Sequence, residues 1–160
     1  MALLVLGAAA ATAAAPPKIK PTGVGQVKLG MTFKQLRQKH LVGKLHKGTC
    51  DAAGPNASPF ARLRSPLRGQ ANFTKSVPHK LTDITIRGGA TARGVGIGDT
   101  IPQIKAAYPK AKVDHSTDET FEFTLVRIPK AGGGNRLQFA VSTKTHKIIE
   151  IGVPFVAVCE

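Results

Sequence analysis

Alternation of apolar and polar residues marks the strands of this chain most clearly in its second half. Apolar residues recur at every second position in three runs, 121–125, 137–142 and 149–153. This period is typical of strands with one buried face. Glycine-rich residues 130–135 and the pair Thr145–His146 separate the runs and predict hairpin turns. In the first half, strands are predicted at 70–74 and 81–87, and residues 51–68 are expected to hold a weak strand or an irregular loop.

Two short helices are predicted from a motif that occurs twice. Its residues are Gly30, Thr32 and Gln35 in the first half, then Gly98, Thr100 and Gln103 in the second. The glycine allows a tight turn, and a threonine three residues before a glutamine has the spacing of a capping box. The helices are expected at 33–40 and 101–108. Each is too short to be stable alone and must pack on a sheet.

The chain as a whole shows an internal repeat with an offset near 67 residues. Three segments match in the same order: 27–37 with 95–105, 71–73 with 137–139, and 79–84 with 146–151. We therefore expect two tandem α/β repeats, residues 23–90 and 91–160, that form one compact unit. The predicted fold class is α+β, with two helices packed on one face of a joined antiparallel sheet. The other face is expected to be polar and free to bind.

The N-terminal residues 1–15 are predicted to be a signal peptide, followed by a disordered linker at 16–22. An apolar stretch begins at Leu3 and continues through small residues to Ala15, too short to span a bilayer. The alternative is a disordered alanine-rich tail. A signal peptide implies a secreted, periplasmic or envelope protein with no transmembrane anchor after cleavage. In such a compartment Cys50 and Cys159 are expected to form a disulfide, the alternative being two free thiols.

The net charge is the unusual feature of the composition. Twenty-three Lys and Arg face nine Asp and Glu, giving +14, and such a field attracts anions. The candidate residues for binding an anion or a partner lie in and around the predicted sheet of the first half: Arg62, Arg64, Arg68, Lys75, Lys80 and Arg87. The alternative is a dispersed, solvated basic surface. A nucleic-acid role is not expected, because aromatic residues for base stacking are few and the chain is exported.

Catalytic and metal-binding motifs give weaker signals. The polar segment 114–119 and the paired turn histidines His79 and His146 could in principle hold a metal, but neither has the spacing of a known site. We interpret them as a solvated loop and as turn residues. No catalytic residue, metal or cofactor is predicted.

The repeated V-x-L/I-G-x-T-x-x-Q-L/I pattern, followed by a strand pair, resembles the β-lactamase-inhibitor-protein-like class. The small outer-membrane assembly lipoproteins carry a related unit. The resemblance covers about 24–151 and implies tandem units that present a concave sheet to a protein partner, without enzymatic activity.

The predicted function is therefore an exported, non-catalytic binding module of the bacterial cell envelope or medium, acting as a monomer. Its target would be a protein, as in an inhibitor, or an anionic envelope polymer. The alternatives are a small secreted hydrolase and a purely structural envelope protein.

Overall fold

A computed structural model describes residues 15–48 and 57–157. The first sheet holds β1 (Ile19–Lys20), β2 (Gly23–Val24) and β3 (Val27–Lys28). Helix α1 (Phe33–Gln38) and strands β4 (Val42–His46), β5 (Phe60–Leu63), β6 (Arg68–Phe73) and β7 (Leu81–Gly88) follow. The second half holds α2 (Ile101–Ala107), β8 (Lys112–Asp114), α3 (Asp118–Phe121), β9 (Phe123–Pro129), β10 (Asn135–Ser142) and β11 (Ile148–Val153). No helix in these ranges is both long and apolar enough to cross a membrane.

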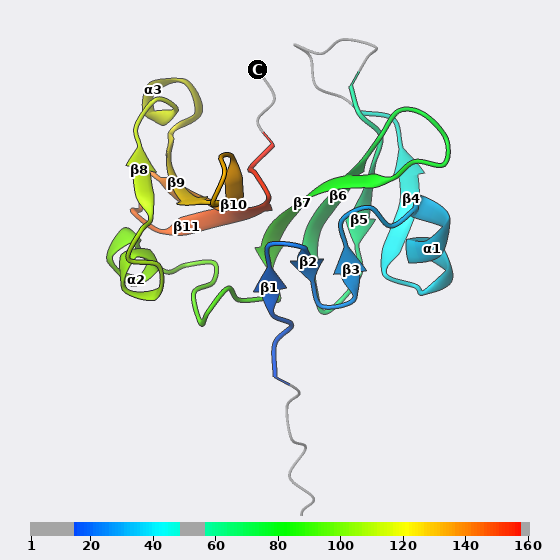
Figure 1. The fold of residues 1–160 in the computed structure, drawn as a ribbon, viewed down its shortest axis with the longest axis horizontal. Helices are drawn as coiled ribbons and strands as arrows, with labels where there is room; N and C mark the ends of the chain where they lie inside the picture. The colour runs from blue at the N-terminus through cyan, green and yellow to red at the C-terminus, as the bar shows by residue number, and fades with distance from the viewer. Residues whose placement is uncertain (1–14, 49–56, 158–160) are drawn as a thin grey trace, which may run out of the picture.

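One antiparallel sheet of eight strands forms the body of the molecule, in the order β4-β5-β6-β7-β11-β10-β9-β8 (Figure 1). In each half a helix precedes four strands, the second half adds the short helix α3 between β8 and β9, and the two halves meet where β7 pairs with β11. There Ile84 pairs with Val153 and Ile86 with Ile151. With the repeat offset of 67 residues, Ile84 is equivalent to Ile151 and Ile86 to Val153. A two-fold rotation that exchanges the halves therefore turns the pair Ile84–Val153 into the pair Ile151–Ile86. From either edge, the sheet therefore begins with the first of the four strands of one half and reaches the fourth at the centre.

Cross-strand register sorts the residues of this sheet onto two faces. The core face carries an apolar row, Ile86, Ile151, Phe139, Val126 and Val113. The opposite face carries a polar row, Arg62, Gln70, Thr85, Gly152, Gln138, Arg127 and Lys112. This division is the period-two consequence of the alternating sequence.

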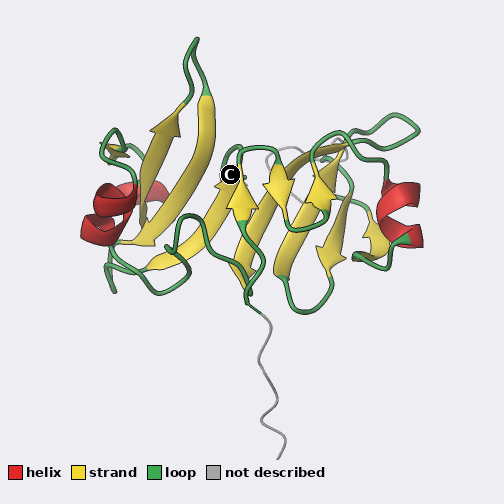
Figure 2. Cartoon of the chain, turned by 60° about the horizontal axis from the view of Figure 1, so that its bottom comes forward, coloured by secondary structure: helices red, strands yellow, loops and turns green. Residues whose placement is uncertain are grey.

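The expected fold class, α+β with two helices covering one face, is wrong: strand makes up 43% and helix 13%. Helices α1 and α2 have six and seven residues, so each is only about 10 Å long. Eight strands spaced at about 4.8 Å span roughly 34 Å, which two such helices cannot cover. They lie near the two ends of the sheet, and the small three-stranded sheet lies between them (Figure 2). Ile19, Val24 and Val27 supply its buried side chains in the common core.

The N-terminal segment 16–22, expected to be a disordered linker, contains strand β1. Ile19 is buried, and its amide donates to the carbonyl of Thr91 at 2.7 Å. A two-residue strand is too short to show periodicity, which is why the sequence pattern missed it. Phe121, expected in a strand, ends the short helix α3 instead.

The two predicted helix starts carry the expected local contacts. The amide of Thr32 donates to Gln35 Oε1 at 2.9 Å, and the amide of Thr100 donates to Gln103 Oε1 at 2.9 Å. Before each cap, Gly30 and Gly98 have positive φ values of 84° and 92°. Their amides donate to carbonyls at the starts of β7 and β11, so the same contact ties each helix to its half of the sheet.

The polar face of the large sheet, expected to be open, is partly covered by the chain itself. The residues after β11 fold back over its centre, and the amide of Val156 donates to Gln138 Oε1 at 2.9 Å. Val156 is buried against Leu125 and Ala140. In Figure 1 residues 154–157 lie between the two rising ends of the curved sheet. The centre of this face is therefore not free to bind.

Candidate functional site

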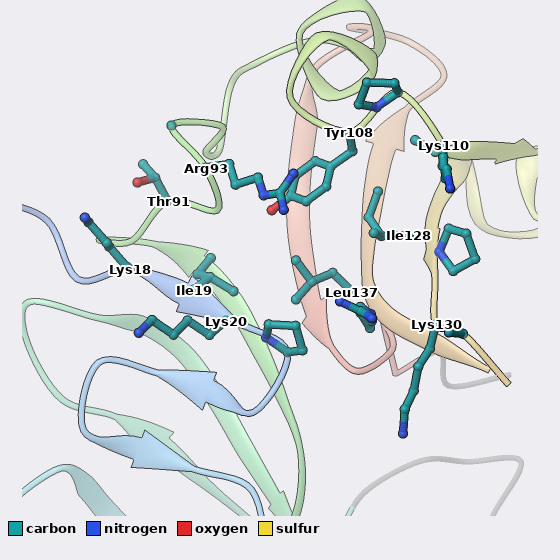
Figure 3. Close-up of a pocket in the computed structure, with 17 residues that line it drawn as sticks. Lys18, Ile19, Lys20, Thr91, Arg93, Tyr108, Lys110, Ile128, Lys130 and Leu137 are labelled. Carbon is teal, nitrogen blue, oxygen red and sulfur yellow. The ribbon is translucent and has the colours of Figure 1, made fainter. Parts of the chain in front are cut away.

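A cleft of about 1040 Å³ opens between β1 and the β9–β10 hairpin, beside the end of α2 (Figure 3). Its lining is made of basic side chains and apolar carbon. Six bases line it: Lys18, Lys20, Arg93, Lys110, Lys130 and Arg136. Among the described residues, no Asp, Glu or His takes part in the lining.

The first wall of the cleft is strand β1. Because Ile19 points into the core, strand alternation turns its neighbours Lys18 and Lys20 outward, and both are exposed. A bridge between Lys18 and Thr91, together with the Ile19 amide bond to Thr91, fixes β1 against the loop that precedes α2. The two lysines are thus set side by side on one rim by backbone hydrogen bonds.

Arg93 and Tyr108 occupy the part of the cleft nearest α2. The guanidinium of Arg93 lies 4.9 Å from the centroid of the Tyr108 ring, and its Nη1 donates to the Ala107 carbonyl at 3.3 Å. This is a cation–π contact. Burial raises the pKa of Tyr108, and the nearby positive charge of Arg93 lowers it in part. Pro109 follows directly, and α2 ends before it.

The facing wall is the β9–β10 hairpin. Ile128 and Leu137 pair across its two strands and are buried in the core. Lys130 and Arg136 lie just beyond them and are exposed, and the Lys130 amide closes the turn by donating to the Gly134 carbonyl at 3.1 Å. The wall is therefore apolar at its base and positively charged at its edge.

The bases of the cleft form no ion pair with a described residue. The described residues form four ion pairs, and all four lie outside the cleft: Arg87–Glu150, His115–Asp118, Arg127–Asp114 and Lys144–Glu122. None of the six cleft bases belongs to one of them. Like charges that share a cleft repel each other, by about 1 kcal/mol in water for two charges 4 Å apart and more where solvent is excluded.

The six bases proposed from the sequence are all exposed, but the structure does not gather them into one site. Arg62 lies on the polar row of β5, and Arg87 is paired with Glu150. Arg64 and Arg68 lie at the β5–β6 turn, where Arg68 lines a smaller cavity of about 350 Å³. The remaining two, Lys75 and Lys80, flank the β6–β7 turn at the other end of the strands. None of the six lines the large cleft.

The histidine and carboxylate candidates also lie apart from the cleft. His79 and His146 have positive φ values of 51° and 56° at the turns before β7 and β11. Because β7 and β11 are antiparallel neighbours, the turns that precede them lie at opposite ends of this strand pair. Within the described ranges, no group of three or more His, Cys, Asp or Glu could hold a metal ion.

In the polar segment 114–119, His115 Nδ1 lies 2.8 Å from Asp118 Oδ2 on an exposed loop. That hydrogen bond holds the pKa of the Asp118 carboxyl below its usual range. The segment lines neither the large cleft nor the smaller cavity. The expected disulfide between Cys50 and Cys159 lies outside the described residues.

Sequence reasoning missed the cleft residues because they come from separate segments of the chain. The only local signal was the alternation Lys18-Ile19-Lys20, which falls in the segment expected to be disordered. The net charge of +14 favoured anions as partners without indicating where on the molecule they would bind.

No known protein family, curated protein or solved structure matches this chain significantly. The resemblance to the β-lactamase-inhibitor-protein-like class therefore stays a prediction. Function has to be inferred from the cleft.

Proposed function

We propose that this protein is an exported, non-catalytic binding module that takes an anionic ligand in the basic cleft. The observation that carries the proposal is the lining itself: six bases around one cavity, with no acid from the described residues among them. Such an arrangement concentrates positive charge in one cleft, which attracts a ligand that carries negative charge.

The chemistry of the lining favours binding over hydrolysis. Apart from the bases, its polar side chains are the hydroxyls of Thr91 and Tyr108. A general acid or base for hydrolysis is usually a carboxylate or an imidazole. The described lining offers neither, and the exposed His115–Asp118 pair lies on a different part of the surface. A secreted hydrolase remains the weaker alternative.

The shape of the site favours an anionic polymer of the cell envelope over a folded protein partner. Bases on facing walls can surround a flexible chain, whereas a convex protein surface would meet only their rim. The large apolar side chains exposed in the described residues are Val77, Ile149 and Phe155. None of the three lines the cleft, so the cleft is not part of an exposed apolar patch of the kind that marks many protein interfaces.

Binding of labelled anionic polymers tests the proposal directly. The probes are inorganic polyphosphate, poly-L-glutamate and a sulfated polysaccharide, followed by fluorescence anisotropy at low salt. The cleft variant is K18Q/K20Q/K110Q/R136Q. The matched control K34Q/K39Q/K44Q/R62Q also loses three lysines and one arginine, all exposed and in the first half of the chain.

We expect the cleft variant to lower affinity for the bound polymer at least about tenfold, or about 1.4 kcal/mol. The control should change affinity by less than about threefold. Equal losses in the two variants would show that the net charge attracts polyanions without a site. Absence of binding to every probe would reject the proposal.

A further inference from the structure

We infer that the ligand is a linear polymer of phosphodiester groups joined by short carbon units, held by both walls of the cleft at once. The inference rests on the proposed function and specifies its ligand. It follows from where the bases lie, how large the cleft is, and what separates the bases.

The bases lie on facing sides of the opening. Figure 3 shows Lys18 and Lys20 on the β1 side and Lys110 and Lys130 on the other, with Arg93 and Tyr108 between them. A ligand that neutralises both sides must reach across the cleft, so its negative charges are distributed along its length.

The volume of the cleft excludes a single small anion as the intended ligand. A water molecule occupies about 30 Å³ in the liquid, and a phosphate or carboxylate group is only a few times larger. In a cleft of about 1040 Å³ such an ion would contact one wall and leave the bases of the other unpaired. A chain with several charges can pair with both.

The surface between the bases is largely carbon, and its polar side chains are the hydroxyls of Thr91 and Tyr108. It is formed by Pro21, Pro109, Pro129, Ala131 and the edges of Ile128 and Leu137. The lining has no carboxamide or carboxylate among its described residues, the groups that would bind the many hydroxyls of a sugar polymer. Short carbon units between phosphates would lie against this surface while the phosphates meet the lysines and arginines.

Nucleic acid, which is also a phosphodiester, fits less well. Its bases need aromatic faces for stacking, and Tyr108 is the aromatic residue of the lining. One face of that ring already carries the guanidinium of Arg93. The carbon units are therefore expected to be small and without bases.

Synthetic glycerol phosphate oligomers of two, four, six and eight units test the inference by calorimetry. Affinity is expected to rise with length up to about six phosphates, one for each base. Counterion release gives a slope of about −0.7 per contact in a plot of log affinity against log salt for flexible chains. Six contacts therefore predict a slope of about −4.

Variants of one wall at a time test whether both walls bind. K18Q/K20Q and K130Q/R136Q are each expected to reduce the magnitude of the slope by about 1.4, while the control K34Q/R62Q leaves it unchanged. Circular dichroism establishes that all three variants are folded. If either wall can be removed without changing the slope, the two-wall arrangement is wrong.

Other outcomes separate the ligand class from the proposed function. Equal affinity for the two-unit and eight-unit oligomers would overturn the linear ligand. Four other polymers of equal charge are compared with the glycerol phosphate oligomers: polyphosphate, poly-L-glutamate, a sulfated polysaccharide and single-stranded DNA. If any of them binds more tightly than the oligomers, the inference that the ligand is a carbon-linked phosphodiester is wrong, while the proposed function stands. If none of these polymers binds, both inferences fail.

Discussion

Gly152 offers a direct test of how the C-terminal segment is held on the polar face. Its φ lies outside the left-handed region, so alanine is compatible with the backbone there. A Cβ at this position would nevertheless lie 2.1 Å from the carbonyl carbon of Phe155 and 2.2 Å from the amide nitrogen of Val156. Backbone atoms cannot yield as a flexible side chain can, so G152A is expected to push the segment off the sheet.

The cost follows from what the segment contributes. Val156 is 5% exposed, and burial of a valine side chain is worth about 1.5–3 kcal/mol. Its amide bond to Gln138 Oε1 adds about 1 kcal/mol, and the conformational entropy regained by the freed segment offsets part of the loss. We expect G152A to lower the free energy of unfolding by about 1–3 kcal/mol. For a chain of this length that corresponds to a Tm lower by about 2–12 °C.

Urea unfolding of three variants and one control measures this effect. V156A alone should destabilise the protein, but it should cost little more in the G152A background, because the segment has already left the sheet. G43A is the control: Gly43 also lies in a strand, and its Cβ would sit 3.6 Å from the Arg62 carbonyl oxygen, an ordinary contact. It should be neutral or stabilise by up to about 1 kcal/mol. Full additivity of G152A and V156A, or wild-type stability of G152A, would refute the reasoning.

Three further substitutions test other parts of the structure. Gly69 has a φ of 138°, and a Cβ there would lie 1.9 Å from the Thr85 carbonyl oxygen. G69A should therefore lower the free energy of unfolding, measured in urea, by more than about 2 kcal/mol, the combined size of backbone strain and steric clash. Burial raises the pKa of Asp83, so the protonated form is favoured on folding and wild-type stability falls as pH rises through the folded pKa. D83N should thus gain stability relative to wild type between about pH 4 and neutrality, and a difference that is constant with pH would contradict this. Tyr108 is the only tyrosine and there is no tryptophan, so titration of its hydroxyl, followed by absorbance, reports on the cleft. R93Q should move the titration midpoint to higher pH, because the charge of Arg93 lowers the pKa of Tyr108. A shift to lower pH would contradict this assignment.

Local features of the sequence were sufficient to predict parts of this fold. A threonine and a glutamine three residues apart specify a helix start through contacts that need no distant partner, and in both motifs the threonine amide donates to the glutamine side chain. In the first motif the Gln35 amide also donates to Thr32 Oγ1. Strand β10 shows its alternation because one face packs on the core. Strand β11 departs from the predicted pattern at its start, where Ile148 is buried and Ile149 is exposed, because its register with β10 shifts there. What covers that core could not be predicted. Strands β1, β2 and β3 have two residues each, too few for a periodicity to identify a strand, and their buried side chains Ile19, Val24 and Val27 pack in the core of the large sheet.

The candidate site escaped prediction for a related reason, which lies in the symmetry of the fold. The repeat directs attention to residues that both halves share, and the cleft is formed where the symmetry is broken. Lys18 and Lys20 belong to β1, an element that precedes the first half and has no counterpart before the second. It pairs with β2 of the first half and is also bonded to the second half, through Thr91. Strand register makes Ala71 equivalent to Phe139, not to Leu137 as the sequence match predicted, and so makes Arg68 equivalent to Arg136. Arg68, however, lies against Gly88 and a separate small cavity. The related halves thus build a rigid sheet, and the unrepeated strand laid against one of them creates the basic cleft. Variants that exchange residues between the halves should therefore affect stability, whereas changes in β1 should affect ligand binding.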